Sequence, residues 1–224
     1  GNGAFYDAVA PAGIASKVMY LKFSSSGVRK WATYCGAYWE QGIAITADPQ
    51  GKRLYATGWT WSNNFPTKNP GNGAYFKNSL NGATGNLFLT EFDTTCTMQW
   101  STLYGGTGWV MGHNVAVGPA GNVLIAVQTT SADFPTQSAG AGSYLQTISG
   151  KGATGAWTAG IVEFDVSRKL AWSTYYGGSK QDGMWGITVH PSGDIYAVGT
   201  TLSTDIPTKT VPANLLNQTT FGGG

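Results

Sequence analysis

Two histidines are the first residues to weigh as catalysts, because imidazole is the side chain that most often transfers protons near neutral pH. His190 lies in a short turn that two similar segments of the chain build from other residue types, which favours a solvated turn residue. His113 follows the second predicted strand of its segment and aligns with Gln41 and Trp185. It is a candidate ligand or general base, although the sequence predicts no nucleophile or carboxylate beside it.

Aspartates recur at two places in the sequence. Asp93 and Asp165 end one predicted strand, and Asp133 and Asp205 precede a proline. A glycosidase needs two acids at a defined separation in one cleft, whereas one acid at a fixed place in each repeat favours a cap or turn hydrogen bond. The sequence contains no DxDxDG calcium loop, no G-x-S-x-G and no phosphate-binding glycine loop. We therefore expect no catalytic residue, no metal and no cofactor.

The two cysteines lack the spacing of a metal site. Cys35 and Cys96 are predicted at opposite ends of the second strand in neighbouring repeats, too far apart for a bridge. We expect free thiols within the chain, and a bond between chains is left open.

Tryptophans are the best candidates for binding. Each predicted loop between second and third strands carries one, Trp39, Trp109 and Trp185, at unequal distances from the next apolar residue. Exposed indoles at one rim would stack on sugar rings or anchor a partner protein. The alternative is that they seal the gap between adjacent units. Trp59 and Trp61 occur in the first copy alone, and their exposure would mark a contact patch.

These residues belong to a sequence that repeats three times. Trp31, Trp100 and Trp172 are 69 and 72 residues apart, and a Pro-Thr pair closes each copy at the same intervals. Within a copy, apolar residues alternate with period two in four short runs separated by turn residues. The segments "DPQG", "GPAG" and "HPSG" predict the hairpin turn between the third and fourth strands.

An all-β fold follows, because no segment carries a helical stripe. One four-stranded meander leaves its faces open, whereas several packed around an axis cover them. We expect a β-propeller with three four-stranded antiparallel blades and long Gly/Asn-rich connections, either partial or part of an oligomeric or longer propeller. The predicted repeats are 1–70, 71–139 and 140–208, with blade cores 17–67, 86–136 and 159–208, and 209–224 begins a fourth connection.

The composition excludes some classes of binding partner. Charged residues make up 11% of the chain, and its 13 basic and 11 acidic residues form no cluster, so nucleic acid is not an expected partner. No apolar run reaches the roughly 18 to 20 residues of a membrane span, so we expect no membrane insertion. The first residues, "GNGAFYDAV", contain no leader, and we expect a mature fragment.

Three consecutive parts of the chain have a recognisable pattern: "EFDVSRKLAWSTYYGG", "GITVHPSGDIYAVGTTLSTDIPT" and "ANLLNQTTFGGG". In this order they resemble the repeat of the bacterial seven-bladed β-propeller repeat family, abbreviated SBBP. The similarity covers nearly the whole chain. The first copy departs from it, with "CGAYWEQ" in place of "YGG" and Asn64 in place of Asp133 and Asp205. The resemblance implies a secreted or cell-surface bacterial protein with an interaction or structural role.

The sequence thus predicts a non-enzymatic extracellular or cell-surface module for assembly or adhesion. Its expected partners are other copies of itself, other surface proteins, or glycans. One alternative is a carbohydrate-binding propeller that uses its rim tryptophans, and a second is a secreted hydrolase whose site the sequence does not reveal.

Overall fold

Twelve antiparallel strands, and no helix, form the described part of the chain. The computed structural model describes residues 3–10, 13, 15–82, 84–149, 156–209 and 218–219. The strands are β1 (Val18–Phe23), β2 (Arg29–Cys35), β3 (Glu40–Ala47), β4 (Arg53–Thr60), β5 (Asn86–Asp93), β6 (Met98–Tyr104), β7 (Val110–Val117), β8 (Val123–Thr129), β9 (Thr158–Phe164), β10 (Leu170–Tyr176), β11 (Asp182–Val189) and β12 (Ile195–Thr201). Most of the predicted fourth connection lies outside the described residues.

The predicted proline turns join β3 to β4, β7 to β8 and β11 to β12. In each, the final glycine donates its N–H to the carbonyl of the first turn residue, at 2.8 to 2.9 Å. These glycines, Gly51, Gly121 and Gly193, have φ angles of 66°, 83° and 94°. Glycine adopts this left-handed conformation without the steric cost that a Cβ brings. The three hairpins are therefore confirmed.

The expected three four-stranded blades are wrong in number and composition. The structure has two four-stranded sheets, β3-β4-β5-β6 and β7-β8-β9-β10, and two two-stranded sheets, β1-β2 and β11-β12. Each four-stranded sheet joins the third and fourth strands of one repeat to the first and second strands of the next. The long connection 61–85 lets β5 return beside β4, with pairs from Arg53↔Asp93 to Thr60↔Asn86. The short segment 36–39 instead carries the chain from β2 to a different sheet.

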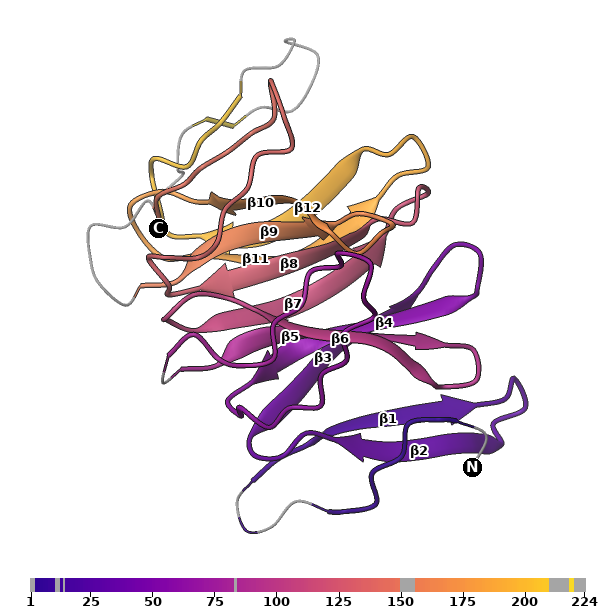
Figure 1. Cartoon of the computed structure of the whole chain (residues 1–224). Helices are drawn as coiled ribbons and strands as arrows, with labels where there is room; N and C mark the ends of the chain where they lie inside the picture. The colour runs from indigo at the N-terminus through magenta and orange to yellow at the C-terminus, as the bar shows by residue number, and fades with distance from the viewer. Residues whose placement is uncertain are drawn as a thin grey trace.

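The four sheets pack face to face in chain order. Figure 1 shows β1-β2 at one end of the stack, and β11 packs against β7, β8 and β9 at the other. A large apolar cluster fills the space between the two four-stranded sheets and includes Leu89, Trp100, Ile125 and Phe164, all fully or almost fully buried. Smaller clusters lie on either side of it. Across the described residues the stack does not close into a ring.

An ion cluster also joins the two four-stranded sheets. Glu91 on β5 is fully buried, and its carboxylate accepts two hydrogen bonds of 2.7 Å from Arg168, in the turn between β9 and β10. Arg53 adds a longer contact of 3.4 Å. A carboxylate removed from water needs such partners.

The repeated connections are held against the second strand of each repeat. The indoles of Trp31, Trp100 and Trp172 donate to a backbone carbonyl of the adjacent connection at 2.8 to 2.9 Å. In each case the acceptor is the carbonyl of the first aromatic residue in the "GNGAFY", "GNGAYF" or "GAGSYL" segment, namely Phe5, Tyr75 and Tyr144. A contact between two repeated segments explains why both are repeated.

Asp93 and Asp165 form the predicted turn hydrogen bonds, whereas Asp133 and Asp205 bond to a loop 26 residues away in the sequence. Asp93 and Asp165 each accept backbone N–H groups of the turn that follows. Asp133 accepts from the amide and hydroxyl of Thr107, and Asp205 does the same with Ser179. The Ser179 amide holds the pKa of Asp205 below its ordinary value. In the part of the chain that the structure describes, no helix is long and apolar enough to cross a membrane.

Candidate functional site

Four of the five candidate tryptophans come together in one cluster. Trp39 stacks on Trp61 with ring centroids 5.4 Å apart and an angle of 21°. The ring centroids of Trp61 and Trp109 are 5.5 Å apart, and the rings of Trp109 and Trp59 are nearly perpendicular, with centroids 5.4 Å apart. We call Trp39, Trp59, Trp61 and Trp109 the tryptophan cluster.

Strand pairing and sheet stacking bring these indoles together. Trp39 and Trp109 directly precede β3 and β7, whereas Trp59 lies in β4 and Trp61 follows it. The amide of Trp61 donates to the carbonyl of Trp39 at 3.2 Å, which continues the β3-β4 pairing beyond the strand ends. Trp39 has a φ of 60°, a conformation that costs energy for a large side chain.

Two members of the cluster are open to solvent. Trp39 and Trp61 are 37% and 38% exposed, and the ring of the half-exposed Tyr38 lies 6.1 Å from that of Trp39. Trp59 and Trp109 are half-buried beneath them. The ring of Trp109 packs so closely on the backbone of Gly85 that a Cβ there would lie 2.5 Å from it. The cluster therefore fills part of the junction between two sheets and also presents an aromatic surface.

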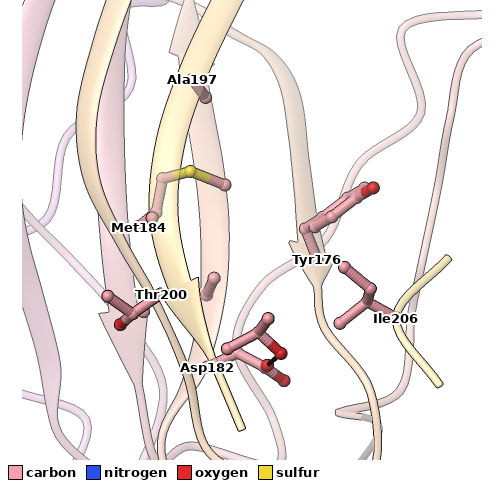
Figure 2. A pocket seen from close by; sticks show the side chains of 10 residues that line it. Tyr176, Asp182, Met184, Ala197, Thr200 and Ile206 are labelled. Atoms are coloured by element: carbon pink, nitrogen blue, oxygen red, sulfur yellow. Dashed lines mark hydrogen bonds between the residues drawn. The ribbon is translucent and has the colours of Figure 1, made fainter. Parts of the chain in front are cut away.

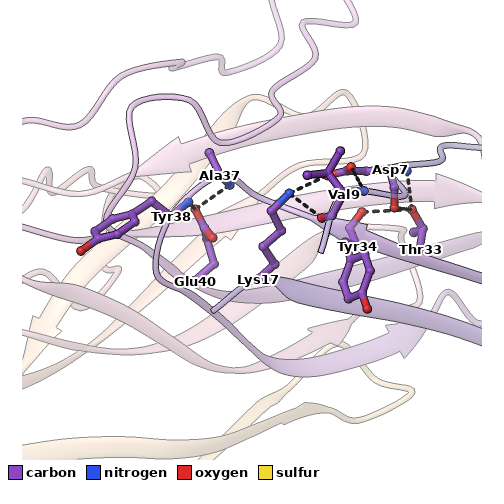
Figure 3. A network of polar contacts seen from close by, with 8 residues as sticks. All are labelled: Asp7, Val9, Lys17, Thr33, Tyr34, Ala37, Tyr38 and Glu40. Carbon is purple, nitrogen blue, oxygen red and sulfur yellow. Dashed lines mark hydrogen bonds and ion pairs between the residues drawn. The ribbon is translucent and has the colours of Figure 1, made fainter. Parts of the chain in front are cut away.

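The loop that carries Trp39 is held by Glu40, which is 1% exposed (Figure 3). Its Oε1 accepts the amides of Ala37 and Tyr38 at 3.1 and 3.0 Å, together with the Thr60 hydroxyl at 3.3 Å. Its Oε2 is buried and has no hydrogen-bond partner among the described residues. Through these hydrogen bonds the Glu40 carboxylate holds the loop in place.

A second polar network in Figure 3 anchors the segment before β1. Lys17 binds the Asp7 carboxylate at 3.1 Å and the Val9 carbonyl at 2.9 Å, and the Asp7 amide donates to the Thr33 hydroxyl at 2.7 Å. The Val9 amide and the Lys17 ammonium lower the pKa of Asp7. The network ties this segment to β2.

Trp185 was predicted in the loop between the second and third strands of its repeat, and this prediction is wrong. It lies within β11, at a bulge that skips one pairing position between Met184 and Gly186. His113 and Ile43 lie at the corresponding bulges of β7 and β3. The alignment of His113 with Gln41 is therefore also wrong, and its equivalent in β3 is Ile43.

His113 and Trp185 form a separate aromatic pair with ring centroids 4.5 Å apart. Burial lowers the pKa of His113, and the neighbouring Gln128 side chain acts against that shift. The imidazole Nε2 is buried and finds no hydrogen-bond partner in the part of the chain that the structure describes. His190 instead bonds to Ser192 at 2.8 Å in the β11-β12 turn, as its turn position predicts.

Neither cysteine offers an accessible thiol. Cys35 and Cys96 are both buried and free of disulfides within the chain. Burial raises the pKa of each thiol, that of Cys35 strongly. Thiolate chemistry is disfavoured at both positions. Among the described residues, no three His, Cys, Asp or Glu side chains are grouped to hold a metal ion.

Two cavities lie beside free strand edges. One of about 160 Å³ is lined by Tyr176, Met184, Ala197 and Ile206, next to the unpaired edge of β12 (Figure 2). Asp182 borders it, but its carboxylate already accepts from the hydroxyls of Thr201 and Ser203 and from the Gly178 amide. A second, of about 270 Å³, lies between β1 and β3. Both are mainly apolar, which indicates missing packing partners.

No protein-family model matches the chain, and a search of curated proteins also finds no match.

Proposed function

We propose that this chain is a non-enzymatic β-propeller module that assembles or adheres through contacts with other proteins. The observation that carries the proposal is the pair of incomplete sheets at the two ends of the stack. Among the described residues, β1 and β12 each pair with one neighbour, whereas their equivalents pair on both sides: β5 and β9 for β1, and β4 and β8 for β12. Unpaired strand edges bind further strands readily.

The propeller form and the extracellular or cell-surface location belong to the same proposal. Face-to-face stacking of antiparallel sheets supports the propeller form. The resemblance to the SBBP repeat supports the location. The buried thiols and the aspartates engaged in turns favour a role without catalysis.

Sedimentation velocity tests this function. We expect a species larger than one chain, and we expect Val198→Lys to dissociate it by placing a charge on the free edge of β12, where Val198 is 67% exposed. Val166→Lys is the matched control, because Val166 is 60% exposed in a turn away from both free edges. A wild-type chain that sediments as a single copy, or equal behaviour of the two variants, contradicts the proposal.

The tryptophan cluster favours a second function, carbohydrate binding. Adjacent exposed indoles and a neighbouring tyrosine suit the apolar faces of sugar rings. We expect neutral oligosaccharides to change the tryptophan fluorescence, and Trp61→Ala to weaken that binding at least tenfold. Trp185→Ala is the control, since Trp185 is 43% exposed and lies outside the cluster. Binding that depends equally on both residues, or no binding, rules this function out.

A further inference from the structure

The two incomplete sheets are complementary halves of one complete sheet. In β3-β4-β5-β6 and β7-β8-β9-β10, the first two strands end one repeat and the last two begin the next. The β11-β12 sheet corresponds to the first two strands of a complete sheet, and the β1-β2 sheet corresponds to the last two. We infer that a second copy of this chain supplies its β1-β2 hairpin to β12, and receives β11-β12 beside its own β1. This inference rests on the proposed assembly function and names the partner.

The complete sheets fix the register of this junction. Leu54 pairs with Phe92 in one and Val123 with Phe164 in the other. The equivalent residues at the free edges are Ile195 on β12 and Phe23 on β1. Continuing the antiparallel pairing from there places Ala197 opposite Leu21 of the second copy.

Side chains exposed on the β1-β2 hairpin correspond to buried side chains elsewhere. Leu21, Phe23 and Tyr34 are 49%, 53% and 37% exposed. Their equivalents on β9 and β10 are each 0% exposed, and they are Val162, Phe164 and Tyr175. The same positions are therefore buried wherever a neighbouring sheet is present.

The existing interfaces between sheets show which contacts these exposed side chains would make with a second copy. Phe92 meets the ring of Trp31 at 5.6 Å, and Phe164 meets that of Trp100 at 5.2 Å. The third tryptophan of the series, Trp172, is only partly buried. Phe23 of the second copy is placed to complete this series.

The cavity beside β12 lies where the Tyr34 ring is expected (Figure 2). The equivalent hydroxyl of Tyr175 donates to the carbonyl of Ser131 at 2.7 Å and accepts from the amide of Phe134 at 3.0 Å. The corresponding groups at the free end are the Ser203 carbonyl and the Ile206 amide. Ile206 lines the cavity, so the tyrosine pocket already exists.

The side chains on the other face of β12 are expected to pack against β3 of the second copy. Tyr196 and Val198 are 58% and 67% exposed, and their equivalents Leu124 and Ala126 pack in one cluster with Ile187. The equivalent of Ile187 on β3 is Ile45, which is 59% exposed and lines the second cavity. Tyr196 and Val198 of one copy thus cover Ile45 of the other.

The number of copies follows from the number of sheets. One chain provides two complete sheets and two halves. Two copies joined at both ends make six four-stranded sheets, within the roughly four to eight of closed propellers. Three copies make nine, which lies beyond that range. The structure therefore favours a closed ring of two chains.

Engineered cysteines test the register directly, because the native cysteines are buried. The double variant Ala197→Cys/Leu21→Cys places thiols at directly opposite positions, within the roughly 4.4 to 6.8 Å between Cα atoms that a disulfide spans. We expect a covalent dimer on mild oxidation. The control Ala197→Cys/Met19→Cys uses an exposed position two residues along β1 in the other direction, at a diagonal separation of roughly 7 to 8 Å, and it keeps Phe23 in place. We expect it to cross-link at least tenfold more slowly.

The outcomes separate this inference from the broader function. Wild-type chains that associate while the two variants cross-link equally overturn the register and leave the assembly function standing. Wild-type chains that stay single, with no cross-linking of either variant, overturn both. Rapid cross-linking into ladders of more than two chains overturns the closed ring.

Discussion

The buried carboxylate of Glu91 gives a quantitative test of how the two four-stranded sheets are joined. Arg168→Ala removes both 2.7 Å hydrogen bonds and leaves only Arg53, at 3.4 Å and 40% exposed. Removing one partner of a buried ion pair costs about 3 to 5 kcal/mol, because the remaining charge has no solvent to replace it. Since Arg53 remains, we expect the free energy of unfolding to fall by about 3 kcal/mol.

A glycine at the same position provides an internal check on that magnitude. Arg168 has a φ of 67°, and the equivalent residue in the first repeat is Gly27, with a φ of 79°. Relieving the left-handed conformation of a non-glycine residue recovers about 1 kcal/mol. Arg168→Gly therefore loses the same ion pair but should destabilise by only about 2 kcal/mol.

Urea unfolding followed by tryptophan fluorescence measures these differences, at one fixed protein concentration because association shifts apparent stability. Glu91→Gln removes the buried charge, and Arg168→Ala in that background should cost less than about 1 kcal/mol. An effect of Arg168→Ala that is small in the wild type, or unchanged in the Glu91→Gln background, refutes the reasoning.

Three further predictions concern single sites. Burial lowers the pKa of Lys77 to about 8, so NMR of the dimethylated protein should show one lysine titrating there, and stability should rise between about pH 8 and pH 10 as the folded form releases its proton first. In Lys77→Met that rise should disappear, and a Lys77 signal titrating with the other lysines contradicts the assignment. Gly85→Ala should lower the free energy of unfolding by about 1 to 3 kcal/mol and change the near-UV circular dichroism, because the new Cβ meets the Trp109 ring; an unchanged spectrum would count against the packing. Tyr34→Phe should weaken dimerisation by roughly a thousandfold, because each of the two junctions loses two hydrogen bonds of about 1 kcal/mol each, one to the Ser203 carbonyl and one from the Ile206 amide, while the unfolding of a single chain changes little. Equal dimer affinity by sedimentation would exclude those bonds.

Local features of the chain were predictable from its sequence. Period-two alternation and Pro/Gly turns are set by neighbouring residues, and they predicted the strands and the three hairpins. Asp93 and Asp165 were rightly expected to bond within turns, as Asp165 does with Ser167, whereas the bond of Asp133 to Thr107 in another loop was not foreseen. The pairing of β4 with β5 was missed, because it joins residues across the connection 61–85 and leaves no local periodicity.

The candidate site was predictable in its residues and not in its grouping. Trp59 and Trp61 are two residues apart, a spacing that places side chains on one face of a strand. That spacing indicated a common surface, but only the stacking of sheets brings them to Trp109. Trp185 was wrongly predicted to lie in a loop. It lies within β11 at a bulge that the sequence does not reveal, beside His113.

In the proposed ring, two copies of the chain complete each other's end sheets. Light scattering after gel filtration, over a hundredfold range of concentration, measures whether this ring forms. We expect the molar mass to reach a plateau at twice the 23.5 kDa of one chain, with no larger species. A mass of 23.5 kDa at every concentration, or one that keeps growing with concentration, would rule out the closed ring of two chains.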